Sequence, residues 1–135
     1  MFGGYVNVPH IFCYVLKGAF YDLEKGTIVS IIEVLKKQKK LVAKPTRSVG
    51  GGSGIHLVEY KDDNLFIDNK IVSEKAFINE VQKWEEYIFV QYITSANYSK
   101  KIYPNATNSI RIVSVHEENG DVNFLFAFHR FGSDL

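Results

Sequence analysis

Residues 41–54 read LVAKPTRSVGGGSG: a short apolar run, then Lys44 and Pro45, then a segment rich in glycine and serine. An apolar run bounded in this way predicts a strand that ends near Lys44 and a loop that extends to Gly54. Because glycines let backbone N–H groups approach a ligand closely, and successive N–H groups form a concavity that attracts anions, phosphate is the natural ligand for this loop. The alternative is a flexible hairpin connection beside a solvated lysine.

Two familiar phosphate loops are excluded by the pattern. The P-loop requires Gly-Lys-Ser/Thr at the start of a helix, and the dinucleotide turn requires Gly-x-Gly-x-x-Gly. Neither spacing occurs, and the residues after Gly54 are typical of a strand. A strand that ends in Lys-Pro, a loop and a returning strand place one fixed cation beside a flap that can close over a triphosphate.

On the N-terminal side of this loop, residues 8–21 are rich in β-branched and aromatic residues and predict a strand or a strand pair broken at Gly18. Thr27 is the expected N-cap of a helix, because apolar residues recur at the helical period from Ile28 to Leu35. The lysine-rich end of that helix is interpreted as a solvated end that complements the helix dipole.

On the C-terminal side, strands are expected at residues 55–60 and 65–67, and a second helix begins at Ser73. The apolar residues Phe77, Ile78, Val81 and Trp84 lie on one side of this helix and should cover a small antiparallel sheet. A buried strand is expected at residues 87–93. Two further strands, 109–116 and 122–128, flank an Asn-Gly pair that indicates a hairpin. The predicted fold class is α+β.

Four blocks of sequence carry a resemblance to a known family. They are residues 41–45 with 50–55, then Phe-Val-Gln-Tyr-Ile at 89–93, then residues 102–113, and finally Phe-His-Arg-Phe-Gly at 128–132. In this order they resemble the ATP-grasp superfamily, in the branch called sugar-transfer associated or alpha-L-glutamate ligase-related. The resemblance extends from about Pro9 onward.

The resemblance implies an ATP-grasp fold fragment and a set of site residues. Residues 1–86 would form the small lobe with its phosphate flap, a small antiparallel sheet with two helices, and residues 87–135 the hinge and the first strands of an incomplete large lobe. Arg111 and Arg130 match strand arginines that face the phosphates or an anionic substrate, and each is equally well a residue of the sheet surface. The implied ATP-binding residues are Lys44, Ser48, Gly50, Gly51, Gly52, Ser53, Gly54, Gln91, Tyr92 and Ile93.

The implied activity is that of a ligase that uses ATP and Mg²⁺ to convert a small-molecule carboxylate into an acyl phosphate, which an amine or similar nucleophile attacks. Cell-surface glycan or peptide biosynthesis is the implied setting. The metal-binding residues of the family are expected beyond Leu135, so we expect a C-terminally truncated fragment that is inactive alone and name no metal ligand within the chain. The alternative function is a non-catalytic module that binds a ligand or a protein.

Composition narrows the range of partners. Sixteen basic and fifteen acidic residues leave a net charge of +1, which gives no global attraction to nucleic acid. No apolar run approaches the roughly 20 residues of a membrane span, so we expect a cytoplasmic protein.

The single cysteine, Cys13, lies in an apolar run and is interpreted as a buried inert thiol. The four histidines are scattered, which makes a zinc site improbable.

Overall fold

The computed structural model describes residues 8–47, 53–104 and 107–131. The chain divides into two compact units, Met1–Tyr92 and Ile93–Leu135, which we describe separately. This division falls later than the expected boundary between residues 86 and 87. The coarse class, α+β, is confirmed, since both units combine antiparallel strands with short helices.

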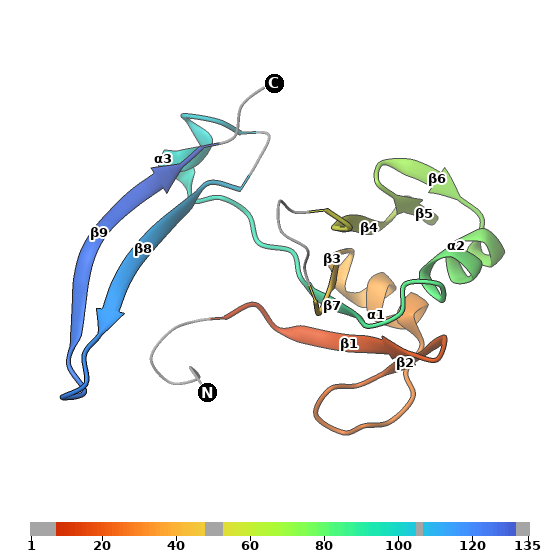
Figure 1. Ribbon diagram of the computed structural model, residues 1–135. Helices are drawn as coiled ribbons and strands as arrows, with labels where there is room; N and C mark the ends of the chain where they lie inside the picture. The colour runs from red at the N-terminus through yellow and green to blue at the C-terminus, as the bar shows by residue number, and fades with distance from the viewer. Residues whose placement is uncertain (1–7, 48–52, 105–106, 132–135) are drawn as a thin grey trace. The chain divides into compact units, whose positions relative to one another are not determined.

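The first unit is built on one curled antiparallel sheet of seven strands, in the spatial order β2-β1-β7-β3-β4-β5-β6 (Figure 1). The hairpin from β3 to β4 contains the glycine-rich loop, as predicted. Strand β6 was not anticipated, because it has only three residues. The strands are β1 (Ile11–Leu16), β2 (Ala19–Tyr21), β3 (Lys40–Pro45), β4 (His56–Lys61), β5 (Asn64–Ile67), β6 (Lys70–Val72) and β7 (Tyr87–Gln91).

Strand β7 joins the two halves of this sheet. It pairs antiparallel with β1 on one side and with β3 on the other. Phe89 at its centre is fully buried, and Val90 on the opposite face is also buried. The strand expected at residues 87–93 is observed over Tyr87–Gln91, with its two buried residues on opposite faces, and β7 belongs to the first unit.

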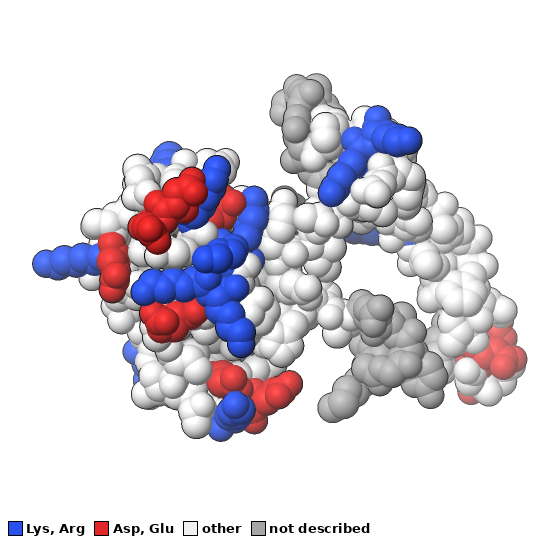
Figure 2. Space-filling view, turned by 180° about the vertical axis from the view of Figure 1, so that it is seen from behind, with Lys and Arg blue, Asp and Glu red and all other residues white. Residues whose placement is uncertain are grey.

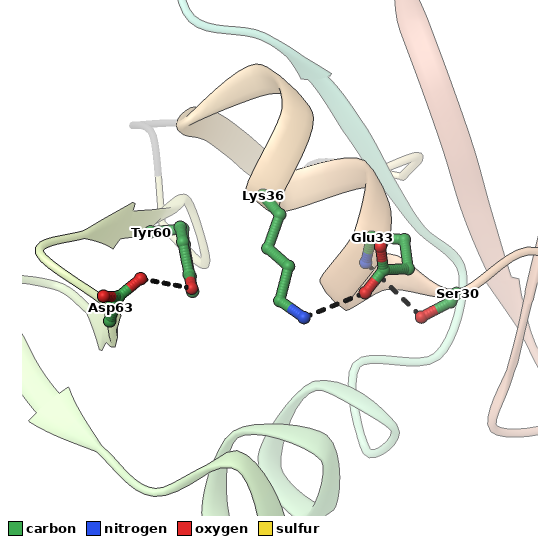
Figure 3. A network of polar contacts seen from close by, with 5 residues as sticks. All are labelled: Ser30, Glu33, Lys36, Tyr60 and Asp63. Carbon is green, nitrogen blue, oxygen red and sulfur yellow. Dashed lines mark hydrogen bonds and ion pairs between the residues drawn. The ribbon is translucent and has the colours of Figure 1, made fainter.

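Two helices of the first unit, α1 (Ile31–Gln38) and α2 (Glu74–Val81), each begin with a serine N-cap. Ser73 Oγ accepts from the N–H of Ala76, as the sequence predicted for α2. The expected cap of α1 at Thr27 was wrong, because Ser30 is the cap and its Oγ accepts from the N–H of Glu33 (Figure 3). The residues before Ser30 continue the pairing of β2 instead, through a bridge between Tyr21 and Ile28.

A single hydrophobic core lies between the sheet and the two helices. Phe77 and Val81 of α2 are fully buried in it, which confirms that this helix covers the sheet. Trp84 is also buried, but it lies beyond the end of the helix. Burial, and secondarily Asp22, raises the pKa of the Cys13 thiol to about 12, as suits an inert core residue. The other core residues are Val15, Phe20, Ile31, Ile32, Leu35, Leu41, Ala43, Val58, Leu65 and Phe89.

The second unit consists of a short helix, α3 (Asn97–Lys100), and the hairpin of β8 (Ser109–His116) with β9 (Val122–Arg130). The predicted hairpin is confirmed, and Gly120 adopts φ 92° in its turn. Apolar side chains of both strands are exposed, among them Phe124 at 74%. Figure 2 shows that most of this unit's visible surface carries no Lys, Arg, Asp or Glu. None of the helices in the described ranges is long and apolar enough to cross a membrane.

Candidate functional site

Lys44 lies on the face of the central sheet opposite the hydrophobic core. Residues that are directly opposite in antiparallel strands share a face, and successive residues alternate between faces. Leu41 and Ala43, which are buried in the core, are opposite Gln91 and Phe89, whereas Val42 and Lys44 are opposite Val90 and Ile88. We call the second face the open face.

An aliphatic stripe runs along the open face beside Lys44. It consists of Val42, Leu57, Ile88 and Val90 from strands β3, β4 and β7, and we call it the open-face stripe. Three of these side chains are half-buried and Val90 is buried. Such a surface provides apolar contact for a flat ring, and Lys44 provides a cation at its end. Within the described part of the chain, no acidic side chain forms an ion pair with Lys44.

Tyr87 contacts both ends of the loop that the sequence singled out. It is directly opposite Pro45, where the loop begins. At the other end Gly54 adopts φ +75°, and a Cβ on it would lie 2.7 Å from the Tyr87 hydroxyl oxygen. Glycine is therefore required at this position by both its backbone conformation and the space. Ser53 is exposed, and Ser48, Gly50, Gly51 and Gly52 lie outside the described residues.

An aromatic stack holds Tyr87 in place. The ring of His56 is stacked on Trp84, with centroids 4.3 Å apart, and Trp84 lies 5.6 Å from the ring of Tyr87. Nδ1 of His56 is 2.8 Å from Oδ2 of Asp68, whose Oδ1 accepts from the N–H of Leu57. Burial acts to raise the pKa of Asp68, but the hydrogen bonds from His56 and Leu57 outweigh it and leave the pKa below its ordinary value.

Three of the implied ATP-binding residues, Gln91, Tyr92 and Ile93, lie where the first unit passes into the second. Gln91 is exposed, and its backbone N–H donates to the carbonyl of His10. Tyr92 is half-buried, and the ammonium of Lys40 lies 4.4 Å from the centre of its ring. Ile93 begins the second unit, where its carbonyl accepts from Thr107 Oγ1 at 3.3 Å.

The two predicted arginines share one face of the second unit's hairpin. Arg111 is directly opposite Phe128, and Arg130 is directly opposite Ser109, two residues before Arg111. The two arginines are thus diagonal neighbours, about 7–8 Å apart at Cα. The guanidinium of Arg111 lies 5.9 Å from the centre of the Phe128 ring. Both side chains are exposed, so the hairpin presents two planar donors on one surface.

The donor set in the first unit fits a phosphate better than a metal ion. Lys44 is a cation beside an apolar surface. No group of three or more His, Cys, Asp or Glu side chains in the described ranges is arranged to hold a metal. Mg²⁺ remains an expectation from the resemblance, and we derive no step through it.

Sequence reasoning missed three features of this region. They are the tyrosine that contacts both ends of the loop, the His56–Asp68 pair, and an ion pair between Lys40 and Glu59 at the other end of β3. Each depends on which residues become neighbours across strands. The sequence held a signal for the Lys40–Glu59 pair alone. Apolar residues alternate with other residues in 40–45 and 56–60, and this alternation places Lys40 and Glu59 on the same face as Lys44.

Comparison with known proteins adds no family assignment. The chain matches no protein-family model, no curated protein and no solved structure. Its function is therefore argued from the geometry above.

Proposed function

We propose that the chain is the ATP-binding portion of an ATP-grasp-like ligase that activates a carboxylate for attack by an amine or a similar nucleophile. The observation that carries the proposal is the position of Lys44, at the end of an apolar strand, on the open face and immediately before the glycine-rich loop. A lysine at the start of a glycine-rich loop favours a polyphosphate, because it offers a cation where such a loop can offer backbone N–H groups.

The open-face stripe supports the same ligand. A nucleotide combines a flat ring with an anionic tail, and sites for such molecules are mostly apolar with a few well-placed polar groups. The stripe would contact the ring, and the ammonium of Lys44 would neutralise part of the charge of the phosphates. ATP bound there supplies the phosphoryl group that activates the carboxylate. The protein's own contribution is to position the phosphates and to offset their charge.

Arg111 and Arg130 are proposed to bind an anionic group of the substrate. They lie on one face of the β8–β9 hairpin, and both carry a planar fork of donors that matches a carboxylate or a phosphate. The guanidinium of Arg111 also lies near the ring of Phe128 on the facing strand, with its centre 5.9 Å from the ring centre. Substituting either arginine is expected to weaken binding of the carboxylate more than binding of ATP.

The test is a thermal unfolding experiment with the whole 135-residue chain, ATP and Mg²⁺. A ligand present at ten times its Kd adds about 1.4 kcal/mol to the free energy of unfolding, which raises Tm by roughly 5 °C for a chain of this size. Lys44→Ala should abolish the rise. Lys37→Ala is the matched control, because Lys37 is an exposed lysine of α1 and its loss removes the same charge. A parent chain whose Tm is unchanged at millimolar ATP contradicts the proposal.

A second candidate is a non-catalytic module that binds a ligand or a protein. The observation that favours it is the set of exposed apolar side chains on β8 and β9, which includes Ile110, Ile112, Phe124 and Phe126. This function predicts no response to ATP in the same experiment. The two candidates are therefore separated by one measurement.

A further inference from the structure

The second unit has no hydrophobic core among its described residues. Its β8–β9 hairpin is a sheet of only two strands, and Ser99 is the one buried residue in the described part of this unit. A two-stranded hairpin is marginally stable in water unless a further strand or layer covers its apolar face. We therefore expect another surface to cover the apolar side chains of this hairpin.

One face of the hairpin carries no Lys, Arg, Asp or Glu within β8 and β9. Directly opposite residues share a face, and successive residues of β8 alternate between faces. Four large apolar side chains of this face are all exposed, and they are Ile110, Ile112, Val122 and Phe124. We call it the Ile112 face, and its other residues are Ser114, His116, Ala127 and His129.

A bulge in β9 separates this face from the two arginines of the hairpin. The register of the strands shifts at Leu125, which has no partner in β8. Strict alternation along β9 would place Val122 and Phe124 on the face of Arg130. The bulge moves both residues to the Ile112 face, which therefore gathers its apolar side chains away from Arg111 and Arg130.

The charged residues of the second unit are divided between its two ends. Within the described residues, its acidic side chains are Glu117, Glu118 and Asp121, all in the β8–β9 turn. Helix α3 lies at the other end, about 25 Å away along β9, because the ring of Tyr98 is 6.1 Å from that of His129 on the Ile112 face. Figure 2 shows the acidic and basic side chains of this unit at opposite ends. The basic residues are Lys100, Lys101, Arg111 and Arg130.

This distribution of charge makes the Ile112 face complementary to a second copy of itself. When two such faces pack with their strands in opposite directions, the acidic turn of each copy lies at the basic end of the other. The same strand direction would bring like charges together, which is unfavourable. A two-fold axis makes the contact twice, so the interface closes at two copies.

We propose that the chain forms a two-fold dimer through the Ile112 face of its second unit, with the strands of the two hairpins in opposite directions. The dimer does not depend on the proposed ATP site, and it leaves Arg111 and Arg130 on the opposite face. The two strands hold fewer residues than the about 20–30 that each partner contributes to a standard interface. We therefore expect a micromolar Kd for the dimer.

The experiment is sedimentation equilibrium of the whole 135-residue chain without nucleotide, from low-micromolar to submillimolar concentration. The average mass should rise from the 15.4 kDa of one chain to twice that value and stop there. Phe124→Ala should raise the dimer Kd at least about tenfold, as expected for an aromatic side chain at the centre of an interface. Phe126→Ala is the matched control and should leave the Kd unchanged, because Phe126 is an exposed phenylalanine of the same strand on the opposite face.

Charge reversal tests the orientation of the two copies. Lys100→Glu with Lys101→Glu, and separately Glu117→Lys with Glu118→Lys, should each weaken the dimer, because the reversed residues face their own sign in a second copy. An equimolar mixture of the two variants should associate as tightly as the parent chain. This recovery also excludes a folding defect, because a misfolded chain would not regain the interface.

Four results would overturn the proposal. The first is a mass that stays at 15.4 kDa throughout, and the second is a mass that rises past two copies, as in open-ended pairing of strand edges. The third is an equal effect of Phe124→Ala and Phe126→Ala. The fourth is a mixture of the charge-reversed variants that fails to associate. Each of these results leaves the proposed ATP site untouched.

Discussion

The contact between Gly54 and Tyr87 gives a prediction whose two physical components can be separated. In Gly54→Ala the new Cβ would lie 2.7 Å from the Tyr87 hydroxyl oxygen, with φ at +75°. The left-handed conformation costs a non-glycine residue about 1 kcal/mol, and overpacking adds about 1–3 kcal/mol. We therefore expect Gly54→Ala to lower the free energy of unfolding by about 2–4 kcal/mol.

Two further variants isolate these components. Gly26 also has a positive φ, +65°, but a Cβ there meets nothing within 4 Å, so Gly26→Ala should cost only the conformational part, about 1 kcal/mol. Tyr87→Phe removes the crowded oxygen, and the next atoms around the new Cβ lie at 3.7 and 3.8 Å. Gly54→Ala combined with Tyr87→Phe should thus be about as stable as Gly26→Ala.

The assay is urea unfolding followed by the fluorescence of Trp84, the one tryptophan of the chain, whose ring lies 5.6 Å from that of Tyr87. The parent, Gly54→Ala, Tyr87→Phe and the double variant form a double-mutant cycle. The reasoning is refuted if Gly54→Ala is no less stable than Gly26→Ala, or if Tyr87→Phe restores none of the loss.

Three other predictions follow from the first unit. Phe89→Ala should destabilise the chain by about 3–5 kcal/mol, because Phe89 is fully buried at the centre of the sheet, and urea unfolding measures this. Asp68 has a lowered pKa in the folded chain, so its stabilising contribution is complete above about pH 4 and is lost as the pH falls through the folded-state pKa. Acid titration should show the parent losing its advantage over Asp68→Asn below that pH, and parallel curves would contradict this. Cys13 should react with a thiol reagent only in denaturant, since the thiol is fully buried and its pKa is raised to about 12; rapid labelling of the native chain would contradict its place in the core.

Local signals predicted most of the strands and one helix start correctly. Ser73 caps α2 because its hydroxyl accepts a backbone N–H three residues later, a contact that short sequence patterns encode. The Asn119-Gly120 pair forms the β8–β9 turn because Gly120 adopts a positive φ. In both cases the interaction involves residues within a few positions of each other.

Interactions between distant residues explain the errors. Thr27 begins an apolar period that resembles a helix, yet Ile28 pairs with Tyr21 and Val29 donates to the carbonyl of Phe20. This pairing extends β2 and delays the helix to Ile31. Helix α3 was missed because its four residues are polar and have no apolar period.

The candidate site was predictable in its residue types and not in its arrangement. The Lys-Pro strand and its glycine loop were visible as a pattern, and the structure places Lys44 on the face away from the core. The common face of Arg111 and Arg130 required the register of β8 with β9, including the irregularity between Val113 and Ser114. Register is set by pairing across the sheet, which one strand's sequence does not contain.

The central claim is that the open face of the first unit binds ATP, and methyl NMR tests it most directly. With saturating ATP, the methyl resonances of the open-face stripe should shift. The methyl resonances of Leu41 and Val58, which are fully buried on the opposite face, should change by only a small fraction of that shift. Lys44→Ala should remove the shifts. Stripe methyls that do not move, or that move no more than the methyls of Leu41 and Val58, would contradict the claim.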